Sequence, residues 1–458
     1  MFGRIRKLHL IGIGGEGISG IAEVLLNMGY EVSGSDLRTT DITRRLDGRG
    51  GRIALGHDPA NLEDAQVVVV SSAIPADNPE VTEARRRGIP VIPRAEMLAE
   101  LMRMKYGIAV GGAHGKTTTT WLISLVLAEG GLDPTIVVGG KLKGLNANAK
   151  LGGGDYLVAE ADESDGSFLK LSPTIAVVTT VDEEHLDHYS GLAEIQDAFA
   201  TFLNSVPFYG TGIMCLDEEN IQSLMPRMEK RVLTYGFSAQ ADFTASDVRG
   251  DGLVTHLMVS NQGRVLGPIE IQLPGLHNVC NALAAVAVGC ELGVDFGKIQ
   301  AALAGFRGIA RRFEIKGEAG GVVVVDDYAH HPTEIEATLR AAREVWGRRI
   351  VAVFQPHRYT RTAALAEQFG RCFYEADVLM VMPIYPAGEE PVAGVHAGQI
   401  VEAASERGHR NVVLCEEQDR LAENLESEVR PGDVVITLGA GDVWKVGEDL
   451  LERRRHAS

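Results

Sequence analysis

Apolar runs and amphipathic segments alternate along the first hundred residues. The apolar runs are Lys7–Ile13, Glu31–Gly34, Val67–Val70 and Val91–Ile92, and helical spacing covers Ser19–Met28 and Ala95–Met104. Strands that are apolar along their whole length are buried on both faces, which is typical of a parallel sheet covered by helices. The pattern predicts an N-terminal Rossmann-like domain over residues 1–105.

The same alternation returns twice further along the chain. Strands are predicted at Ile108–Gly111, Tyr156–Glu160 and Ile175–Thr179, and later at Val322–Val325, Ile350–Phe354, Val378–Val381, Val412–Leu414 and Val434–Thr437. Residues 232–273 instead contain short alternating strands broken by Gly, Asn and Asp, which indicates an antiparallel annex. The sequence therefore predicts an α/β fold of three domains: 1–105, a central α/β domain with the annex over 106–308, and a Rossmann-like domain over 309–458.

Composition excludes several classes of protein. The 458 residues include 44 Lys plus Arg and 62 Asp plus Glu, so the net charge is −18, and 45% are hydrophobic. Nucleic-acid binding depends on basic residues, so no nucleic-acid partner is expected. No run reaches the roughly 18 apolar residues of a membrane helix, so no membrane insertion is expected. The five cysteines form no CxxC pair, which indicates a reducing cytoplasm with neither a disulfide framework nor a zinc site.

The first candidate site is a glycine-rich turn between a predicted strand and helix. Gly12, Gly14, Gly15 and Gly17 permit a tight turn and close backbone approach to a diphosphate at a helix N-terminus. Asp36 follows 19 residues after Gly17, where a dinucleotide enzyme places its ribose-binding acid. The turn predicts a nucleoside diphosphate site and leaves NAD possible. Ser71 and Ser72, after the Val67–Val70 strand, are candidates for the same crevice.

The second candidate is the segment Gly111–Thr118, again between a strand and a helix. Its backbone N–H groups can surround phosphates, Lys116 can reach the β- and γ-phosphates, and the Thr117 hydroxyl can bind Mg²⁺. The loop is one residue tighter than the eight-residue Walker pattern, which would need glycine at Val110. It predicts a P-loop ATPase-like central domain and leaves a kinase, an ATPase or an ATP-dependent ligase open.

Acidic and imidazole groups follow two strands of the central domain. Glu160 ends one strand just before the acidic segment 162–165, and His185 follows the next. Mg²⁺ prefers oxygen ligands and commonly takes one or two carboxylates together with phosphates. A magnesium site is therefore predicted at the sheet edge that carries the phosphate loop.

Polar groups also gather at strand and helix ends later in the chain. His277 and Asn281 lie four residues apart, on one face of a predicted helix that also carries Asn278. The segment 326–334 forms a polar strand–helix junction, and Arg358 and Arg361 follow the next strand. Two arginines three residues apart can grip a carboxylate, so an anionic ligand is predicted there.

Taken in order, these motifs resemble the Mur ligases of peptidoglycan synthesis. The resemblance covers nearly the whole chain and rests on Gly12–Gly17, Ser35-Asp36, His114–Thr117, Glu160–Asp165, His277-Asn278, Asn281, Arg311–Phe313, Asp327–Glu334 and His357–Arg361. Within the family it is strongest to the branch that joins L-alanine to UDP-N-acetylmuramate. It implies that ATP phosphorylates the lactyl carboxylate and that the amine of L-alanine attacks the acyl phosphate. A cytoplasmic monomer or homodimer is expected.

The resemblance also implies roles for individual residues. Catalysis would involve Lys116, Glu160, His185 and Arg312, with Mg²⁺ held by Thr117, Glu160 and His185. ATP would be bound by Gly112, Ala113, His114, Gly115, Lys116, Thr117, Thr118, His277, Asn278, Asn281 and Asp327. The UDP-sugar would be bound by Gly14, Gly15, Gly17, Ser35, Asp36, Ser71 and Ser72, and the amino acid by Tyr328, His330, Arg358 and Arg361.

Three positions depart from the family pattern, and three other functions compete. Ala113 stands where the family usually has Thr, and Thr180 and Glu184 stand where it usually has Asn and Asp. No lysine lies between Lys170 and Lys230, so the carbamylated lysine of the later ligases is absent, which fits the alanine-adding branch. The alternatives are a recycling ligase that adds a tripeptide, an NAD-dependent dehydrogenase, and a regulatory UDP-sugar-binding protein with an inactive ATPase site.

Overall fold

The computed structural model describes residues 5–71, 74–139, 149–185, 188–415 and 421–457. The described chain contains three β-sheets. It forms two compact units, the first made of Met1–Asp247, Leu257–Ile269 and Cys280–Phe306, and the second of Val248–His256, Glu270–Val279 and Arg307–Ser458. None of the described helices is long and apolar enough to cross a membrane.

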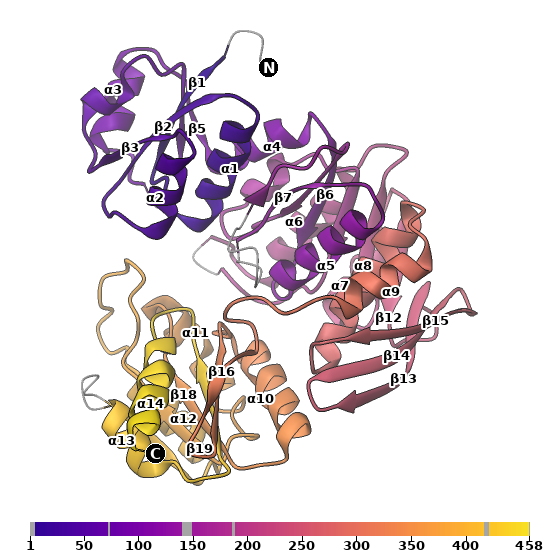
Figure 1. The fold of residues 1–458 in the computed structure, drawn as a ribbon, viewed down its shortest axis with the longest axis vertical. Coiled ribbons are helices and arrows are strands. Elements are labelled where there is room, and N and C mark those ends of the chain that lie inside the picture. The colour runs from indigo at the N-terminus through magenta and orange to yellow at the C-terminus, as the bar shows by residue number, and fades with distance from the viewer. Residues whose placement is uncertain (1–4, 72–73, 140–148, 186–187, 416–420, 458) are drawn as a thin grey trace. The chain divides into compact units, whose positions relative to one another are not determined.

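The first sheet is parallel throughout and has the strand order β3-β2-β1-β4-β5 (Figure 1). Its strands are β1 (Lys7–Ile11), β2 (Glu31–Asp36), β3 (Arg52–Leu55), β4 (Val67–Val70) and β5 (Val91–Pro93), and its helices are α1 (Glu16–Asn27), α2 (Asp41–Gly48), α3 (Pro79–Arg86) and α4 (Arg94–Met102). Val68 and Val69 point to opposite faces of β4 and are both fully buried, so helices or loops cover both faces. The predicted Rossmann-like arrangement is confirmed. β3 was not predicted, because its residues are only partly buried and it lacks a continuous apolar run.

The second sheet has the strand order β15-β14-β13-β12-β11-β10-β6-β9-β7-β8. Its strands are β6 (Tyr106–Gly111), β7 (Thr135–Val137), β8 (Ala149–Lys150), β9 (Tyr156–Glu160), β10 (Ile175–Val178), β11 (Thr211–Cys215), β12 (Val232–Gly236), β13 (Phe243–Asp251), β14 (Val254–Asn261) and β15 (Arg264–Ile271). Its helices are α5 (Lys116–Glu129), α6 (Leu192–Asn204), α7 (Glu219–Gln222), α8 (Leu276–Glu291) and α9 (Phe296–Ala304). β6, β9, β10, β11 and β12 pair in parallel, so their carboxyl ends share one edge.

The annex is smaller than its predicted range of 232–273. β12 pairs in parallel with both β11 and β13, and four of its five residues are buried. It therefore belongs to the parallel core of the sheet. The annex consists of β13, β14 and β15, which are joined by two-residue turns that require antiparallel neighbours.

The third sheet has the strand order β16-β17-β21-β18-β19-β20, and only β16 runs antiparallel to its neighbour. Its strands are β16 (Glu314–Ala319), β17 (Val322–Asp327), β18 (Ile350–Phe354), β19 (Val378–Val381), β20 (Val412–Leu414) and β21 (Val434–Leu438). Its helices are α10 (Pro332–Trp346), α11 (Tyr359–Phe369), α12 (Gly398–Glu406), α13 (Leu421–Glu428) and α14 (Trp444–Ala457).

Two apolar layers enclose this third sheet. Val323 and Val325 of β17 pack in one layer with residues of α10, α11 and α12, and Val322 and Val324 pack in the other with residues of α13 and α14. This alternation explains why the strand has a continuous apolar run. The second Rossmann-like arrangement is thereby confirmed. β16 was missed because its partly buried, polar residues carry no strand signal.

Candidate active site

The glycine-rich turn between β1 and α1 lies against the carboxyl end of β2. The N–H groups of Gly12 and Ile13 both donate to the carbonyl oxygen of Ser35, at 2.8 and 3.1 Å. The N–H of Gly14 donates to Asp36 Oδ2 at 2.9 Å, and a Cβ on Gly14 would lie 2.8 Å from the same oxygen. The structure therefore requires glycine at position 14 and places the Asp36 carboxylate at the edge of the turn.

An arginine outside the sequence motifs faces this turn. Arg94 is the first residue of α4, and a Cβ on Gly17 would lie 3.0 Å from its Nη1 atom. Its Nη2 atom pairs with Asp162 Oδ2 at 3.2 Å. A guanidinium group beside the N-terminus of α1 adds positive charge where the helix dipole already favours an anion.

The side chain of Ser35 belongs to a buried polar network. Its hydroxyl donates to Glu80 Oε2 at 2.5 Å and lies 2.9 Å from His57 Nδ1. Glu80 is fully buried and also accepts a hydrogen bond from Asn61 Nδ2 at 2.6 Å. Burial acts to raise the pKa of Glu80, but the groups of His9, Ser35 and Asn61 that face it outweigh this and lower it to about 2. The Ser35 side chain thus fixes the carboxyl end of β2 through this buried network. Its contact with the UDP-sugar stays a prediction.

The remaining serines predicted for this site have different outcomes. A Cβ on Gly12 would lie 3.5 Å from Ser71 Cβ, so Ser71 adjoins the turn. Ser72 lies outside the described residues. The structure thus brings Gly14, Gly17, Asp36 and Ser71 to one turn, where their UDP-sugar contacts stay predictions.

The loop from Gly111 to Gly115 connects β6 to α5 and cannot carry side chains at two positions. Gly112 has φ +129°, and a Cβ there would lie 2.2 Å from Thr179 Oγ1. Gly115 has φ +80°, and its Cβ would lie 2.6 Å from Asn281 Oδ1. Left-handed backbone and close neighbours both exclude larger residues, so the sequence places glycine at these two positions.

Lys116 folds back over this loop. Its Nζ atom donates to Gly112 O at 2.5 Å, to Ala113 O at 3.1 Å and to Glu163 Oε1 at 2.8 Å. Burial acts to lower the pKa of Lys116, but the Glu163 carboxylate outweighs it and holds the pKa above its ordinary value. The lysine is therefore charged and lies at the start of α5, next to the N–H groups that would face a phosphate.

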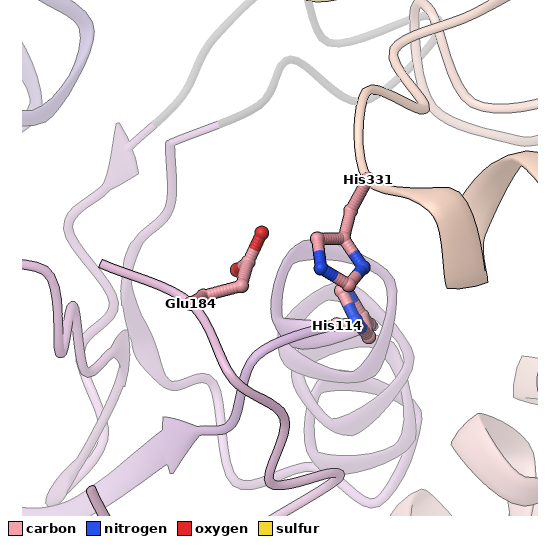
Figure 2. A group of neighbouring side chains, drawn as sticks. All are labelled: His114, Glu184 and His331. Carbon is pink, nitrogen blue, oxygen red and sulfur yellow. The ribbon is translucent and has the colours of Figure 1, made fainter. Parts of the chain in front are cut away.

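His114 is held by the segment that follows β10. Its N–H donates to Thr180 Oγ1 at 2.8 Å, and its Nε2 atom lies 3.1 Å from Asp182 Oδ2. Figure 2 shows His114 on the turn before α5 and Glu184 on the segment that follows β10. Thr180, where the family usually has Asn, thus anchors the loop through its hydroxyl.

A cluster of two carboxylates and one imidazole lies beside Lys116. Glu163, Glu184 and His185 each place a ligand atom within 4.8 Å of the other two, and both glutamates are buried. Glu163 Oε2 accepts no hydrogen bond from any residue that the structure describes. His185 adopts φ +56°, an unusual backbone conformation for a residue with a side chain. Such a set of donors suits a divalent cation.

Glu160, the predicted metal ligand at the end of β9, is not a member of this cluster. Among the described residues its carboxylate instead faces Gly139, whose Cβ would lie 3.0 Å from Glu160 Oε2. The predicted grouping of Thr117, Glu160 and His185 around Mg²⁺ stays a prediction. Glu163 lies in the acidic segment 162–165 that the sequence places at the magnesium site, but the predicted ligand set does not include it.

The polar residues at the start of α8 have separate environments. Asn281 Oδ1 accepts a hydrogen bond from Thr119 Oγ1 at 3.0 Å, which attaches α8 to α5 beside the phosphate loop. Asn278 is buried, and its Nδ2 atom donates to Pro274 O at 2.8 Å. His277 is exposed to solvent. The structure thus brings Asn281 to the loop, while the ATP contacts of all three stay predictions.

In the second unit, two adjacent arginines lie on Tyr328 but have different partners. Arg311 pairs with buried Asp326 at 3.0 Å, and its guanidinium also donates to the carbonyl oxygen of Gly439 at 2.6 Å. Arg312 instead lies 3.7 Å from Glu334. Both guanidinium carbons are 5.1 Å from the centre of the Tyr328 ring. Arg311 therefore stabilises the fold, while Arg312 lies nearer the polar junction before α10.

Asp327 ends β17 in a buried position. Its two carboxylate oxygens accept hydrogen bonds from the N–H groups of Phe313 and Ala329, both at 2.8 Å. Burial raises the pKa of Asp327 to about 6, although Arg312 and these N–H groups act to lower it. Its carboxylate consequently orders the chain on both sides of β17, and its ATP contact stays a prediction.

Two strand ends of the second unit bring the predicted amino-acid site together. The His330 and His357 rings lie 5.8 Å apart, and the His330 ring is 5.4 Å from that of Tyr328. Arg361 Nη1 lies 3.4 Å from His357 Nδ1, and Arg358 is the N-cap of α11 with φ +70°. Burial lowers the pKa of His357 to about 3, helped by His330 and both arginines. His357 belongs to the motif His357–Arg361 that carries the family resemblance, although the sequence predicts no role for it.

His331 follows as the N-cap of α10, where Figure 2 labels it. It is buried, and its N–H donates to Glu334 Oε2 at 3.3 Å within a capping box. The sequence signal for this cap is glutamate three residues after the N-cap, at the start of an amphipathic helix. Glu334 thus fixes the start of α10 and pairs with Arg312.

Models of Mur ligase domains match most of the chain. Residues 7–106 match the Mur ligase family catalytic domain, residues 110–289 the Mur ligase middle domain, and residues 311–441 the Mur ligase glutamate ligase domain. These boundaries lie close to the predicted domain limits, which themselves stay predictions.

Individual relatives match over the full length. A UDP-N-acetylmuramate–L-alanine ligase from Geotalea daltonii is 56% identical over 457 residues and is covered completely, as is this chain. The structure is similar to a UDP-N-acetylmuramate–alanine ligase from Thermotoga maritima, with a TM-score of 0.81, 29% identity, and 99% of this chain and 100% of that one covered. It is also similar to a murein peptide ligase from Psychrobacter arcticus, with a TM-score of 0.72, 25% identity and 98% of both chains covered. The chain belongs to the Mur ligase family.

Proposed function

We propose that this protein is the ligase that joins L-alanine to the lactyl carboxylate of UDP-N-acetylmuramate at the expense of ATP. The observation that carries the proposal is the end-to-end likeness to an alanine-adding ligase at 56% identity. The activity belongs to peptidoglycan synthesis. An NAD-dependent dehydrogenase is wrong, because the chain is a Mur ligase from its first domain to its third.

The turn after β1 is assigned to the diphosphate of the UDP-sugar. Glycines at positions 14 and 17 let the backbone approach the phosphates, and Arg94 adds a positive charge beside them. Asp36 is the acceptor for a ribose hydroxyl, because its carboxylate is already oriented by the N–H of Gly14. An acidic chain can in this way bind an anionic substrate through local groups.

The loop before α5 is assigned to the phosphates of ATP. Lys116 would exchange Glu163 for a phosphate oxygen and neutralise the negative charge that develops as the phosphoryl group is transferred. Asn281 supports the loop from α8. Phosphoryl transfer to the lactyl carboxylate then yields the acyl phosphate, which loses phosphate after attack by the amine.

The donors beside the loop fit a magnesium ion. Glu163 Oε2 is buried without a hydrogen-bond donor among the described residues, and Glu163 Oε1 lies 3.6 Å from His185 Nε2. We assign the ion to His185, Glu163 and the predicted ligands Thr117 and Glu160. When bound, Mg²⁺ supplies charge neutralisation at the phosphates of ATP.

The cluster of Tyr328, His330, Arg358 and Arg361 is assigned to L-alanine. Its arginines suit the carboxylate of an amino acid, and the low pKa of His357 keeps that ring neutral beside them. The protein is proposed to act in the cytoplasm on UDP-N-acetylmuramate and L-alanine. Its oligomeric state, monomer or homodimer, stays a prediction.

Phosphate release tests the proposal. The purified protein is incubated with ATP, Mg²⁺ and UDP-N-acetylmuramate, and either L-alanine or the tripeptide is supplied as acceptor. Phosphate release that requires both the UDP-sugar and L-alanine, with the amide product seen by mass spectrometry, is expected. Turnover with the tripeptide alone would establish the recycling ligase, and UDP-sugar binding without any phosphate release would establish the inactive regulatory protein.

A further inference from the structure

Two cysteines that are 65 residues apart in the sequence meet in the first unit. Cys215 ends β11, and Cys280 lies in the early part of α8. Their sulfur atoms and a carboxylate oxygen of Asp217 all lie within 4.8 Å of one another. The spacing of the five cysteines predicted no zinc site, because neither thiol has a cysteine neighbour in sequence.

The carboxylate of this cluster is already oriented. Asp217 accepts the N–H of Phe237 on Oδ2 at 2.6 Å and the N–H of Ser238 on Oδ1 at 2.9 Å. A Cβ on Gly236 would lie 2.5 Å from Asp217 Oδ2, so glycine is needed for the carboxylate to take this position. Hydrogen bonds that orient a ligand in this way are typical of the second shell of metal sites.

Burial and exposure in the cluster suit an ion entering from solvent. Cys215 is buried, Cys280 is partly buried and Asp217 is exposed. A divalent cation that enters from the exposed carboxylate would bind both sulfur atoms as thiolates and displace their protons.

We propose that Cys215, Cys280 and Asp217 form a binding site for a thiophilic divalent cation of the zinc class. Two thiolates and one carboxylate provide three protein ligands and leave the fourth tetrahedral position open to water. Thiolates select zinc over magnesium, so the site is chemically distinct from the carboxylate and imidazole groups beside Lys116. It is independent of the ligase activity.

Metal titration of the reduced full-length protein tests the site. Cd²⁺ is added to the metal-free protein, and the ultraviolet sulfur-to-metal charge-transfer band is followed; Zn²⁺ affinity is then measured by competition with a chromophoric chelator. One equivalent of Cd²⁺ is expected to saturate the band. Cys215→Ser and Cys280→Ser should each weaken Zn²⁺ binding at least about 100-fold, more than the typical loss of a second-shell partner.

Cys290→Ser is the matched control, because Cys290 lies on the same helix and outside the cluster. It should bind Zn²⁺ as the wild type does. Equal Zn²⁺ affinity in the wild type and Cys215→Ser, or no charge-transfer band in the wild type, would overturn the proposal.

A second measurement needs no variant, in case Cys215→Ser fails to fold. Wild-type protein is alkylated with and without one equivalent of Zn²⁺ under partly opening conditions, and the modified cysteines are identified by mass spectrometry. Zn²⁺ should protect Cys215 and Cys280 but not Cys290. Equal protection of all three, or of none, contradicts the site. Neither readout depends on turnover, so failure of the ligase proposal would be recognised separately.

Discussion

Two glycine-rich loops of the first unit follow parallel strands and precede helices, yet their surroundings differ. At the turn after β1, an acceptor carboxylate, Asp36, binds a glycine N–H, and a cation, Arg94, lies beside it. At the loop after β6, the cation is Lys116 on the helix itself, paired with buried Glu163. Backbone geometry makes each loop an anion site, and the neighbouring charges decide which anion it can hold.

The two loops also share an electrostatic connection. Asp162 pairs with Arg94 at the first loop, and both Arg94 and Lys116 act to lower its pKa against the effect of burial. Arg94 and Lys116 are nevertheless separate cations, each beside its own loop, and Asp162 partly offsets the charge of both. We therefore expect substitutions at one loop to affect mainly the ligand of that loop.

The largest difference between the two loops is expected in turnover and UDP-sugar binding of Lys116→Ala. Turnover should fall on the order of 1,000-fold, because a preorganised positive charge at the transferring phosphoryl group is lost. Binding of the UDP-sugar, measured by calorimetry, should change less than about threefold. Lys150→Ala is the control, since Lys150 lies at the surface, where it pairs with exposed Asp133. Normal turnover of Lys116→Ala would contradict the assignment of the phosphate loop.

Gly112→Ala should destabilise the second loop without touching the first. Its φ of +129° and the 2.2 Å approach to Thr179 Oγ1 together predict a loss of about 2–5 kcal/mol in the free energy of unfolding. Gly131→Ala separates the two causes, because Gly131 has φ +84° but open space around it. Urea unfolding should show the smaller loss for Gly131→Ala; equal losses would mean that the close approach has no cost.

The contribution of the buried Glu80 network, which lies next to the first loop, to the free energy of unfolding is expected to depend on pH. The pKa of Glu80 is lowered in the fold from 4.5 to about 2, so the folded state binds its proton less readily than the unfolded state. Its contribution of about 3 kcal/mol is complete above pH 4.5 and is lost as the pH falls towards 2. Unfolding of wild type and Glu80→Gln should therefore differ most at pH 6, and the difference should narrow below pH 4.5. A constant difference across this range would contradict the lowered pKa.

The smallest effect is expected from Asp36→Asn. The amide retains one oxygen for the N–H of Gly14 but loses the charge that favours a ribose hydroxyl. The KM for the UDP-sugar should rise about fivefold to tenfold, as expected for a loss of about 1 kcal/mol, with the KM for ATP unchanged. Steady-state kinetics with each substrate varied in turn measures both values. A rise in the KM for ATP instead would contradict the assignment of the UDP-sugar to the first loop and of ATP to the second.

Strand positions were predictable where a strand is apolar along its whole length, as in β1, β4, β18 and β21. β3 and β16 were missed because half-exposed residues weaken the signal. β7 and β11 were missed although they are buried, because they are short or contain Thr and Gly. The parallel pairing of β12 could not be predicted from its residues. Whether a short apolar strand joins a parallel core or an antiparallel annex depends on its neighbours.

The candidate site was predicted best where a motif is local. Gly112, Gly115 and Lys116 lie within five residues of one another, between β6 and the start of α5. Their proximity in space therefore follows from their proximity in the sequence. Arg94 and the pairing of Glu163 with Lys116 were not predicted, for the opposite reason. Arg94 is 77 positions from Gly17, and Glu163 is 47 positions from Lys116.

The sequence by itself determined three α/β domains, two phosphate-binding loops and membership of the Mur ligase family, because backbone conformation and strand burial leave local patterns. Only the tertiary structure decided which charges stand beside each loop and that Cys215 meets Cys280 next to Asp217. Electrostatic and coordinating groups act over a few ångströms in space, and folding alone brings residues from distant strands and helices within that distance.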